Sequence, residues 1–74
     1  MVKDLDYYMS LNYELKLIED DEEGGFTAYY PDLPGCITCG ETLERTLENA
    51  EDAKRVWLMA TLEDGMEIKE PAVA

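Results

Sequence analysis

Two cysteines separated by two residues are the first side chains in this sequence that could do chemistry. Cys36 and Cys39 have the C-x-x-C spacing of a redox dithiol or of half a zinc site. Structural zinc needs four ligands, and the chain has no histidine, so only two copies that pool their cysteines could complete such a site. A thioredoxin-type thiol lies at a helix N-terminus, whereas the helix predicted here begins after Thr42. In an extended segment the two side chains point to opposite faces, and we interpret both cysteines as small buried hydrophobic residues.

Carboxylates are the second group that could do chemistry. Asp32, Glu41 or Glu14 could bind a metal in a metal-dependent nuclease. Acid–base catalysis near neutral pH usually uses histidine or a carboxylate whose pKa is raised by burial, and most acids here fall on faces predicted to be exposed. The sequence has no histidine, no serine triad and no glycine-rich phosphate loop. It therefore favours a protein that is not an enzyme and that holds no metal or cofactor.

The charge balance limits the kind of partner. The chain has 18 acidic and 6 basic residues, a formal net charge of -12, and the basic residues are scattered. Phosphate backbones are bound by clustered Lys and Arg, so we expect no direct binding to DNA. An acidic surface attracts basic proteins and speeds their capture, although the same charge also fits a role in solubility alone.

The length of 74 residues predicts one compact domain over residues 1–74. A domain of this size buries only about 60% of the surface of its unfolded chain, so we expect self-association to a dimer or tetramer. No apolar run approaches the ~20 residues of a membrane span, and residues 1–10 do not resemble a leader. Two cysteines also fit a reducing compartment. We therefore expect a cytoplasmic protein without membrane contact.

Three strands and two loops are predicted in the first half of the chain. Apolar and polar residues alternate over residues 11–19, which indicates a half-buried strand after an irregular or briefly helical lead-in. Residues 20–25 are four acids and two glycines and predict a hairpin loop into a second strand over 26–30. Two prolines and a glycine in residues 31–35 predict a rigid connection to a third strand over 37–40.

One long helix dominates the second half. Thr42 as N-cap and Gly65 after the last turn predict a helix from Leu43 to about Asp64. Residues three and four apart form its predicted buried face, with Trp57 as the main anchor. The members of this face are Leu43, Leu47, Ala50, Ala53, Trp57 and Ala60. The apolar arc is widened by further residues, which predicts an oligomer interface at the helix end. These residues are Leu58, Met59 and Leu62.

A short strand over residues 66–70 before Pro71 completes the expected order β-β-β-α-β. The predicted class is α+β, a small antiparallel sheet with one long helix packed on one face.

The segment Tyr30-Pro31-Asp32-Leu33-Pro34-Gly35-Cys36, followed by Gly40-Glu41-Thr42-Leu43-Glu44, resembles the signature of the HicB-like antitoxin family. The similarity covers essentially the whole chain in the family's order and spacing. It continues through Leu47-Glu48-Asn49-Ala50, Ala53, Trp57 and Gly65-Met66-Glu67-Ile68 with Pro71. The resemblance implies a partial RNase H-like fold, in which the metal-binding carboxylates of an active enzyme are not recognisable.

The resemblance also implies a function, that of the antitoxin in a type II toxin-antitoxin system. Such an antitoxin masks the surface of a small basic mRNA-cleaving toxin of the HicA type. Longer family members carry a C-terminal DNA-binding domain, and this chain resembles the short form with the N-terminal domain only, so we expect partner capture without gene control. The alternative is a stand-alone oligomeric interaction domain with no toxin partner. The residues expected to contact a toxin are Asp20, Asp21, Glu22, Glu23, Asp32, Leu33, Pro34, Gly35 and Cys36.

Overall fold

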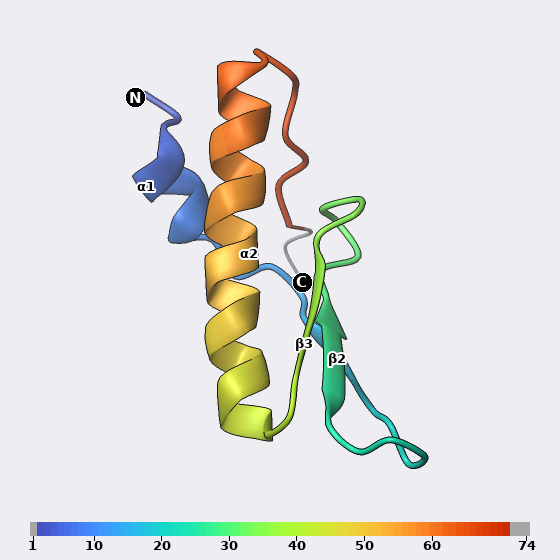
Figure 1. Cartoon of the computed structure of the whole chain (residues 1–74). Coiled ribbons are helices and arrows are strands. Elements are labelled where there is room, and N and C mark those ends of the chain that lie inside the picture. Colours follow the sequence, from blue (N-terminus) through green and yellow to red (C-terminus); the bar gives the residue numbers. More distant parts are fainter. Residues whose placement is uncertain (1, 72–74) are drawn as a thin grey trace.

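The structure, a computed structural model, describes residues 2–71. These residues form a three-stranded antiparallel sheet of order β1-β2-β3, with a long helix on one face (Figure 1). The elements in chain order are α1 (Leu5–Met9), β1 (Lys16–Glu19), β2 (Phe26–Tyr29), β3 (Ile37–Gly40) and α2 (Leu43–Glu63). The predicted α+β class, with a small antiparallel sheet and one long helix, is confirmed. Within residues 2–71, neither helix combines the length and the apolar character needed to cross a membrane.

The ends of α2 are those that the sequence predicts. Thr42 is the N-cap, and its Oγ1 accepts a hydrogen bond from the backbone N–H of Arg45 at 3.1 Å. Asp64 follows the last helical residue, and Gly65 has a φ of 68°, the left-handed conformation typical of a helix C-terminus. Both signals act within one turn, so they set the two ends of the helix locally.

The buried face of α2 differs from the predicted face. Its buried residues lie four apart and are Thr46, Ala50, Lys54 and Leu58. Leu43 and Leu47 are 48% and 43% exposed, whereas Leu58 is fully buried and replaces Trp57 as the main anchor. The reason is α1, which packs against α2 and covers the flank that the narrow sheet leaves open. Leu58 is therefore not available to the oligomer interface predicted at the helix end, whereas Met59 is 44% exposed, and that interface stays a prediction.

The first strand is shorter and more exposed than predicted. Only Lys16–Glu19 pairs with β2, and all four residues are exposed instead of half-buried. The helix packs against β2 and β3 and does not reach β1. Leu17 and Ile18 are consequently 39% and 55% exposed, although both are apolar.

Residues 66–70 do not form the predicted fourth strand. The segment returns beside α2 and the loop after β2 (Figure 1) and is held by side chains. Ile68 is buried, and the Tyr13 hydroxyl donates to the Lys69 carbonyl at 2.6 Å. Glu70 accepts hydrogen bonds from the Lys3 ammonium at 2.8 Å and the Tyr7 hydroxyl at 2.7 Å. These contacts replace the backbone pairing that the sequence pattern suggested.

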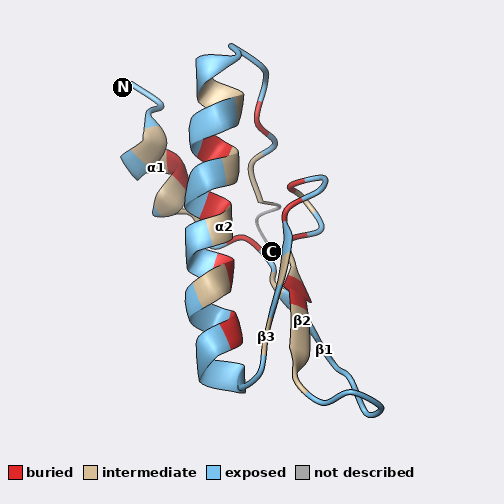
Figure 2. Cartoon of the chain, viewed as in Figure 1, coloured by how far each residue is buried: buried red, intermediate tan, exposed pale blue. Residues whose placement is uncertain are grey.

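The core lies mainly between α2, α1, the loop after β2 and the C-terminal segment (Figure 2). Ala28 is the one buried residue within the three strands. The other buried apolar residues are Tyr8, Tyr13, Tyr30, Leu33, Cys36, Ala50, Leu58 and Ile68. The sheet is therefore a thin layer, with much of its surface open to partners.

Candidate protein-binding surfaces

The loop between β2 and β3 is closed by its own backbone. The N–H of Leu33 donates to the Tyr30 carbonyl at 3.0 Å, and the N–H of Cys36 donates to the Leu33 carbonyl at 2.9 Å. The Tyr30 N–H donates to the Cys36 carbonyl at 3.1 Å, which joins the two ends of the loop. The rigid connection expected from the two prolines is confirmed by these successive turns.

Three side chains fix this rigid loop, residues 31–36, to the rest of the molecule. Leu33 has no exposed surface and packs within the hydrophobic core. The indole Nε1 of Trp57 donates to the Pro34 carbonyl at 2.8 Å, and an Oδ1 of Asp32 lies 3.1 Å from Lys69 Nζ. The loop is thus bonded to α2 and to the C-terminal segment. These contacts hold its outer surface in one conformation.

The residues of the rigid loop that the sequence predicts to touch a partner divide into two sets. Pro34 and Gly35 are exposed, and Asp32 is half-buried in its ion pair. Leu33 and Cys36 are buried, so their side chains hold the loop against the core instead of facing a partner.

The cysteines do not form a dithiol site. Cys36 is buried on the helix side, and Cys39 is exposed on the other side of the strand, as expected for extended backbone. Burial raises the pKa of the Cys36 thiol, which keeps it protonated at neutral pH. The interpretation as a small buried residue is confirmed for Cys36 and wrong for Cys39. Within residues 2–71, no cluster of three or more His, Cys, Asp or Glu side chains could hold a metal ion.

The acidic loop, residues 20–25, is ordered by its first residue. The Asp20 carboxylate accepts hydrogen bonds from the backbone N–H of Glu22 at 3.0 Å and of Glu23 at 3.2 Å. Gly25 has a φ of 85°, and a Cβ there would meet the Gly40 carbonyl at 2.7 Å, so the close approach of loop and β3 requires glycine. All four acids are exposed.

The acidic loop and the rigid loop lie at opposite ends of β2 (Figure 1). The structure therefore does not bring the two predicted contact segments together. A strand of this length spans roughly 13 Å. One partner must extend over the sheet to touch both loops.

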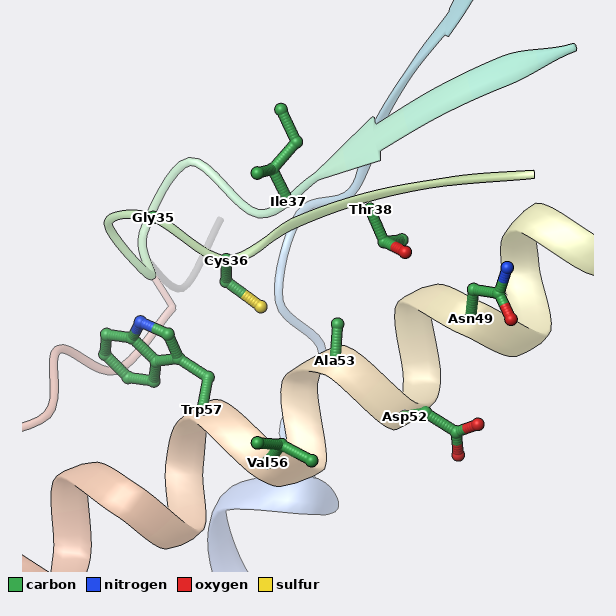
Figure 3. Close-up of a pocket in the computed structure, with 9 residues that line it drawn as sticks. All are labelled: Gly35, Cys36, Ile37, Thr38, Asn49, Asp52, Ala53, Val56 and Trp57. Atoms are coloured by element: carbon green, nitrogen blue, oxygen red, sulfur yellow. The ribbon is translucent and has the colours of Figure 1, made fainter.

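A groove of about 490 Å³ between β3 and α2 was missed by the sequence reasoning. In Figure 3, Cys36, Thr38 and Ala53 point into the space between strand and helix, and Ile37 points away from it. The exposure of Ile37 follows from alternation once Cys36 is known to point inward, but the sequence does not show which face of this strand meets the helix. A second groove, of about 460 Å³, lies on the other side of Trp57 against the C-terminal segment.

Two clearly altered pKa values belong to groups that hold the chain together. Burial raises the pKa of Tyr13 to about 12. Hydrogen bonds from Lys3 and then from Tyr7 lower the pKa of Glu70. These groups bind one another or the backbone. They therefore stabilise the fold. The exposed grooves and loops are the parts of the surface suited to contact another molecule.

The family model and the similar proteins found by comparison agree with one another. Residues 14–73 match a family described as HicB-like antitoxin of bacterial toxin-antitoxin system. A UPF0150 protein of Synechocystis sp. is 48% identical over 48 residues, which are 65% of this chain and 64% of that protein. A UPF0150 protein of Archaeoglobus fulgidus is 35% identical over 51 residues, 66% of this chain and 74% of the relative. The chain thus spans about two thirds of the length of these curated relatives. The family match includes the sheet, both loops and α2.

Proposed function

The chain belongs to the HicB-like antitoxin family, and from this premise we propose that it neutralises a small basic toxin of the HicA type by covering the toxin's surface. The carrying observation is the family match together with the net charge of -12. An RNA-cleaving protein needs Lys and Arg to hold phosphates, so its working surface is basic. An acidic antitoxin complements that surface and needs no catalysis of its own.

The two loops have different tasks in this proposal. The acidic loop carries exposed charges and steers the toxin during approach. The rigid loop offers Pro34 and Gly35 in a fixed shape, and Leu33 and Cys36 hold that shape from the core. A preorganised loop loses little conformational entropy on binding, which favours affinity. Because a HicA-type toxin cleaves mRNA, the proposal expects both proteins in the cytoplasm.

The test measures association with a small basic protein of the HicA type, taken from the gene next to this one where the genome encodes such a protein there. Reversal of Asp21, Glu22 and Glu23 to Lys keeps Asp20, which orders the acidic loop. We expect the association rate constant in stopped-flow mixing to fall on the order of tenfold at low salt, with a weaker salt dependence.

The matched control reverses the same number of exposed charges elsewhere, at Asp6, Glu63 and Asp64. This control should change the association rate much less than the loop variant. Co-expression should also relieve the growth arrest caused by the basic protein. No complex in isothermal titration and no relief of arrest would contradict the proposal and favour the alternative, an oligomeric interaction domain without a toxin.

A further inference from the structure

The groove of about 460 Å³ beside Trp57, hereafter the tryptophan groove, lies between α2, the rigid loop and the C-terminal segment. Its apolar lining includes Trp57, Pro34 and Met66, and Met66 is 64% exposed. Trp57 also lines the groove of about 490 Å³ shown in Figure 3, where its indole extends from α2 toward the rigid loop. The indole ring is therefore a wall shared by two grooves.

Both sides of the tryptophan groove are held in place. The Trp57 indole N–H donates to the Pro34 carbonyl at 2.8 Å, which fixes the ring against the rigid loop. On the side of the C-terminal segment, Ile68 is buried in the core, and the Lys69 carbonyl accepts a hydrogen bond from the Tyr13 hydroxyl at 2.6 Å. A ligand that enters this groove meets a surface that is already formed, which favours affinity.

The side-chain hydrogen-bond donors of the tryptophan groove already have partners. Among the described residues that line it, Trp57, Thr61 and Lys69 carry such donors. The indole N–H is bonded to the rigid loop, and the Thr61 hydroxyl donates to the Trp57 carbonyl at 2.8 Å. The Lys69 ammonium is paired with Asp32 at 3.1 Å, so its charge is balanced. A ligand that brought only acceptors would therefore find few donors in this groove.

The groove instead offers acceptors beside the aromatic ring. Glu67 is exposed and has no ion pair among residues 2–71. Asp32 keeps a second carboxylate oxygen besides the one that faces Lys69, and the Thr61 hydroxyl oxygen keeps its lone pairs. The pair of Asp32 with Lys69 adds no net charge, so Glu67 makes the lining negative. The tryptophan groove therefore fits a cation that has several donors and a flat face.

We propose that the tryptophan groove receives an arginine side chain of the basic toxin. A guanidinium is flat, has five N–H donors and no acceptor, and stacks on aromatic rings. In this groove it lies against the Trp57 ring, donates to Glu67 and packs its aliphatic stem along Met66. This inference rests on the proposed function and deepens it, because it names the toxin side chain that the antitoxin takes up. An arginine held here is withdrawn from RNA phosphates.

The lining favours arginine over the other side chains that could enter. A lysine ammonium is a compact and strongly hydrated charge, which makes less use of an aromatic face. An apolar side chain brings no donor for Glu67 and gains nothing from the net charge of -12. A carboxylate is repelled by the same charge. Lysine is therefore the alternative that an experiment must separate from arginine.

The first experiment uses the fluorescence of Trp57, which is the only tryptophan in the chain and so reports directly on this groove. The probes are hexa-arginine and hexa-lysine peptides of equal charge, titrated into the full chain in about 150 mM NaCl to screen non-specific attraction. We expect hexa-arginine to quench the emission, with a dissociation constant about threefold or more below that of hexa-lysine. Equal dissociation constants, or an emission that does not change, overturn the proposal.

Two matched variants decide which side of Trp57 the arginine occupies. Glu67→Gln removes a carboxylate from the tryptophan groove, and Asp52→Asn removes one from the groove between β3 and α2. Both residues are exposed and each variant loses one charge, so the two proteins differ in the position of that charge. We expect Glu67→Gln to raise the dissociation constant of hexa-arginine about threefold, and Asp52→Asn to change it less than about 1.5-fold. Equal effects, or the reverse order, overturn the proposal.

The complex with the HicA-type protein provides a second readout. Fluorotryptophan incorporated into this chain alone gives one ¹⁹F signal, from Trp57. We expect that signal to shift when the toxin binds, and Glu67→Arg to raise the dissociation constant of the complex on the order of tenfold. A toxin that binds and leaves the signal unmoved overturns this inference while the proposed function stands. A chain that selects hexa-arginine but captures no toxin contradicts the proposed function and, with it, the source of the arginine.

Discussion

The two edge strands of this sheet, β1 and β3, differ in charge and in the support they receive from α2. β1 has charged residues at both ends, Lys16 and Glu19, an ion pair of Lys16 with Glu14 at 3.9 Å, and the acidic loop directly after it. Within the described part of the chain, residues 2–71, no helix packs against it. β3 has no charge and is supported by α2. Charge is a common protection of a sheet edge against unwanted pairing. The difference teaches that the edge of β1 is protected by charge, whereas the edge of β3 carries no charge and depends on α2 for its support.

The largest expected effect tests how closely α2 supports β3. A Cβ at Gly40 would meet Thr46 Oγ1 at 2.6 Å and the Thr46 backbone nitrogen at 2.8 Å. Thr46 is fully buried and cannot retreat, so Gly40→Ala should lower the free energy of unfolding by about 2–3 kcal/mol. Glu19→Ala is the matched change, because Glu19 and Gly40 flank the same residue of β2, Phe26. It should cost under about 0.5 kcal/mol in urea unfolding. Equal losses would remove the contrast between the edges.

The next effect concerns the attachment of β1, which depends on Tyr13 before the strand. Tyr13 is buried and its hydroxyl donates to the Lys69 carbonyl at 2.6 Å, so Tyr13→Phe should lower the free energy of unfolding by about 1 kcal/mol. The pKa of Tyr13 is raised from 10.0 to about 12, so its neutral form is favoured by folding. This contribution is complete below pH 10 and is lost as the pH rises toward 12.

Thermal melts between pH 8 and 11.5 check this prediction. Tyr13→Phe should show a smaller alkaline loss of stability than the unchanged chain. Tyr29→Phe, on β2, serves as the control and should keep the full loss. A Tyr13→Phe variant that declines as steeply as the unchanged chain would show that the attachment of β1 does not depend on this hydroxyl.

The sequence predicts features that depend on neighbouring residues. Thr42 and Gly65 bound α2 because caps act within one turn, and the two prolines predict the rigid loop because they restrict φ locally. The exposure of β1 depends on where α2 lies across the sheet, and the burial of Leu58 depends on α1. Both are contacts between distant segments that periodicity does not encode.

For the candidate surfaces too, the sequence predicts what neighbouring residues determine and misses what depends on distant segments. The acidic loop and the rigid loop are continuous segments, so composition and turn residues identify them. The burial of Leu33 could not be predicted, because an apolar residue in a loop can either pack in the core or be exposed for contact with a partner. The open edge of β3 needs the sheet order and the direction of its backbone groups, which are known only once Cys36 is placed against β2.

The smallest expected effect concerns Asn49, a side chain of α2 that donates a hydrogen bond to β3. Its Nδ2 donates to the Cys39 carbonyl at 2.8 Å, so Asn49→Ala should lower the free energy of unfolding by about 0.5–1 kcal/mol. Urea unfolding checks this loss. A variant that is as stable as the unchanged chain would show that this hydrogen bond does not help α2 to hold β3, and that packing alone supports this edge.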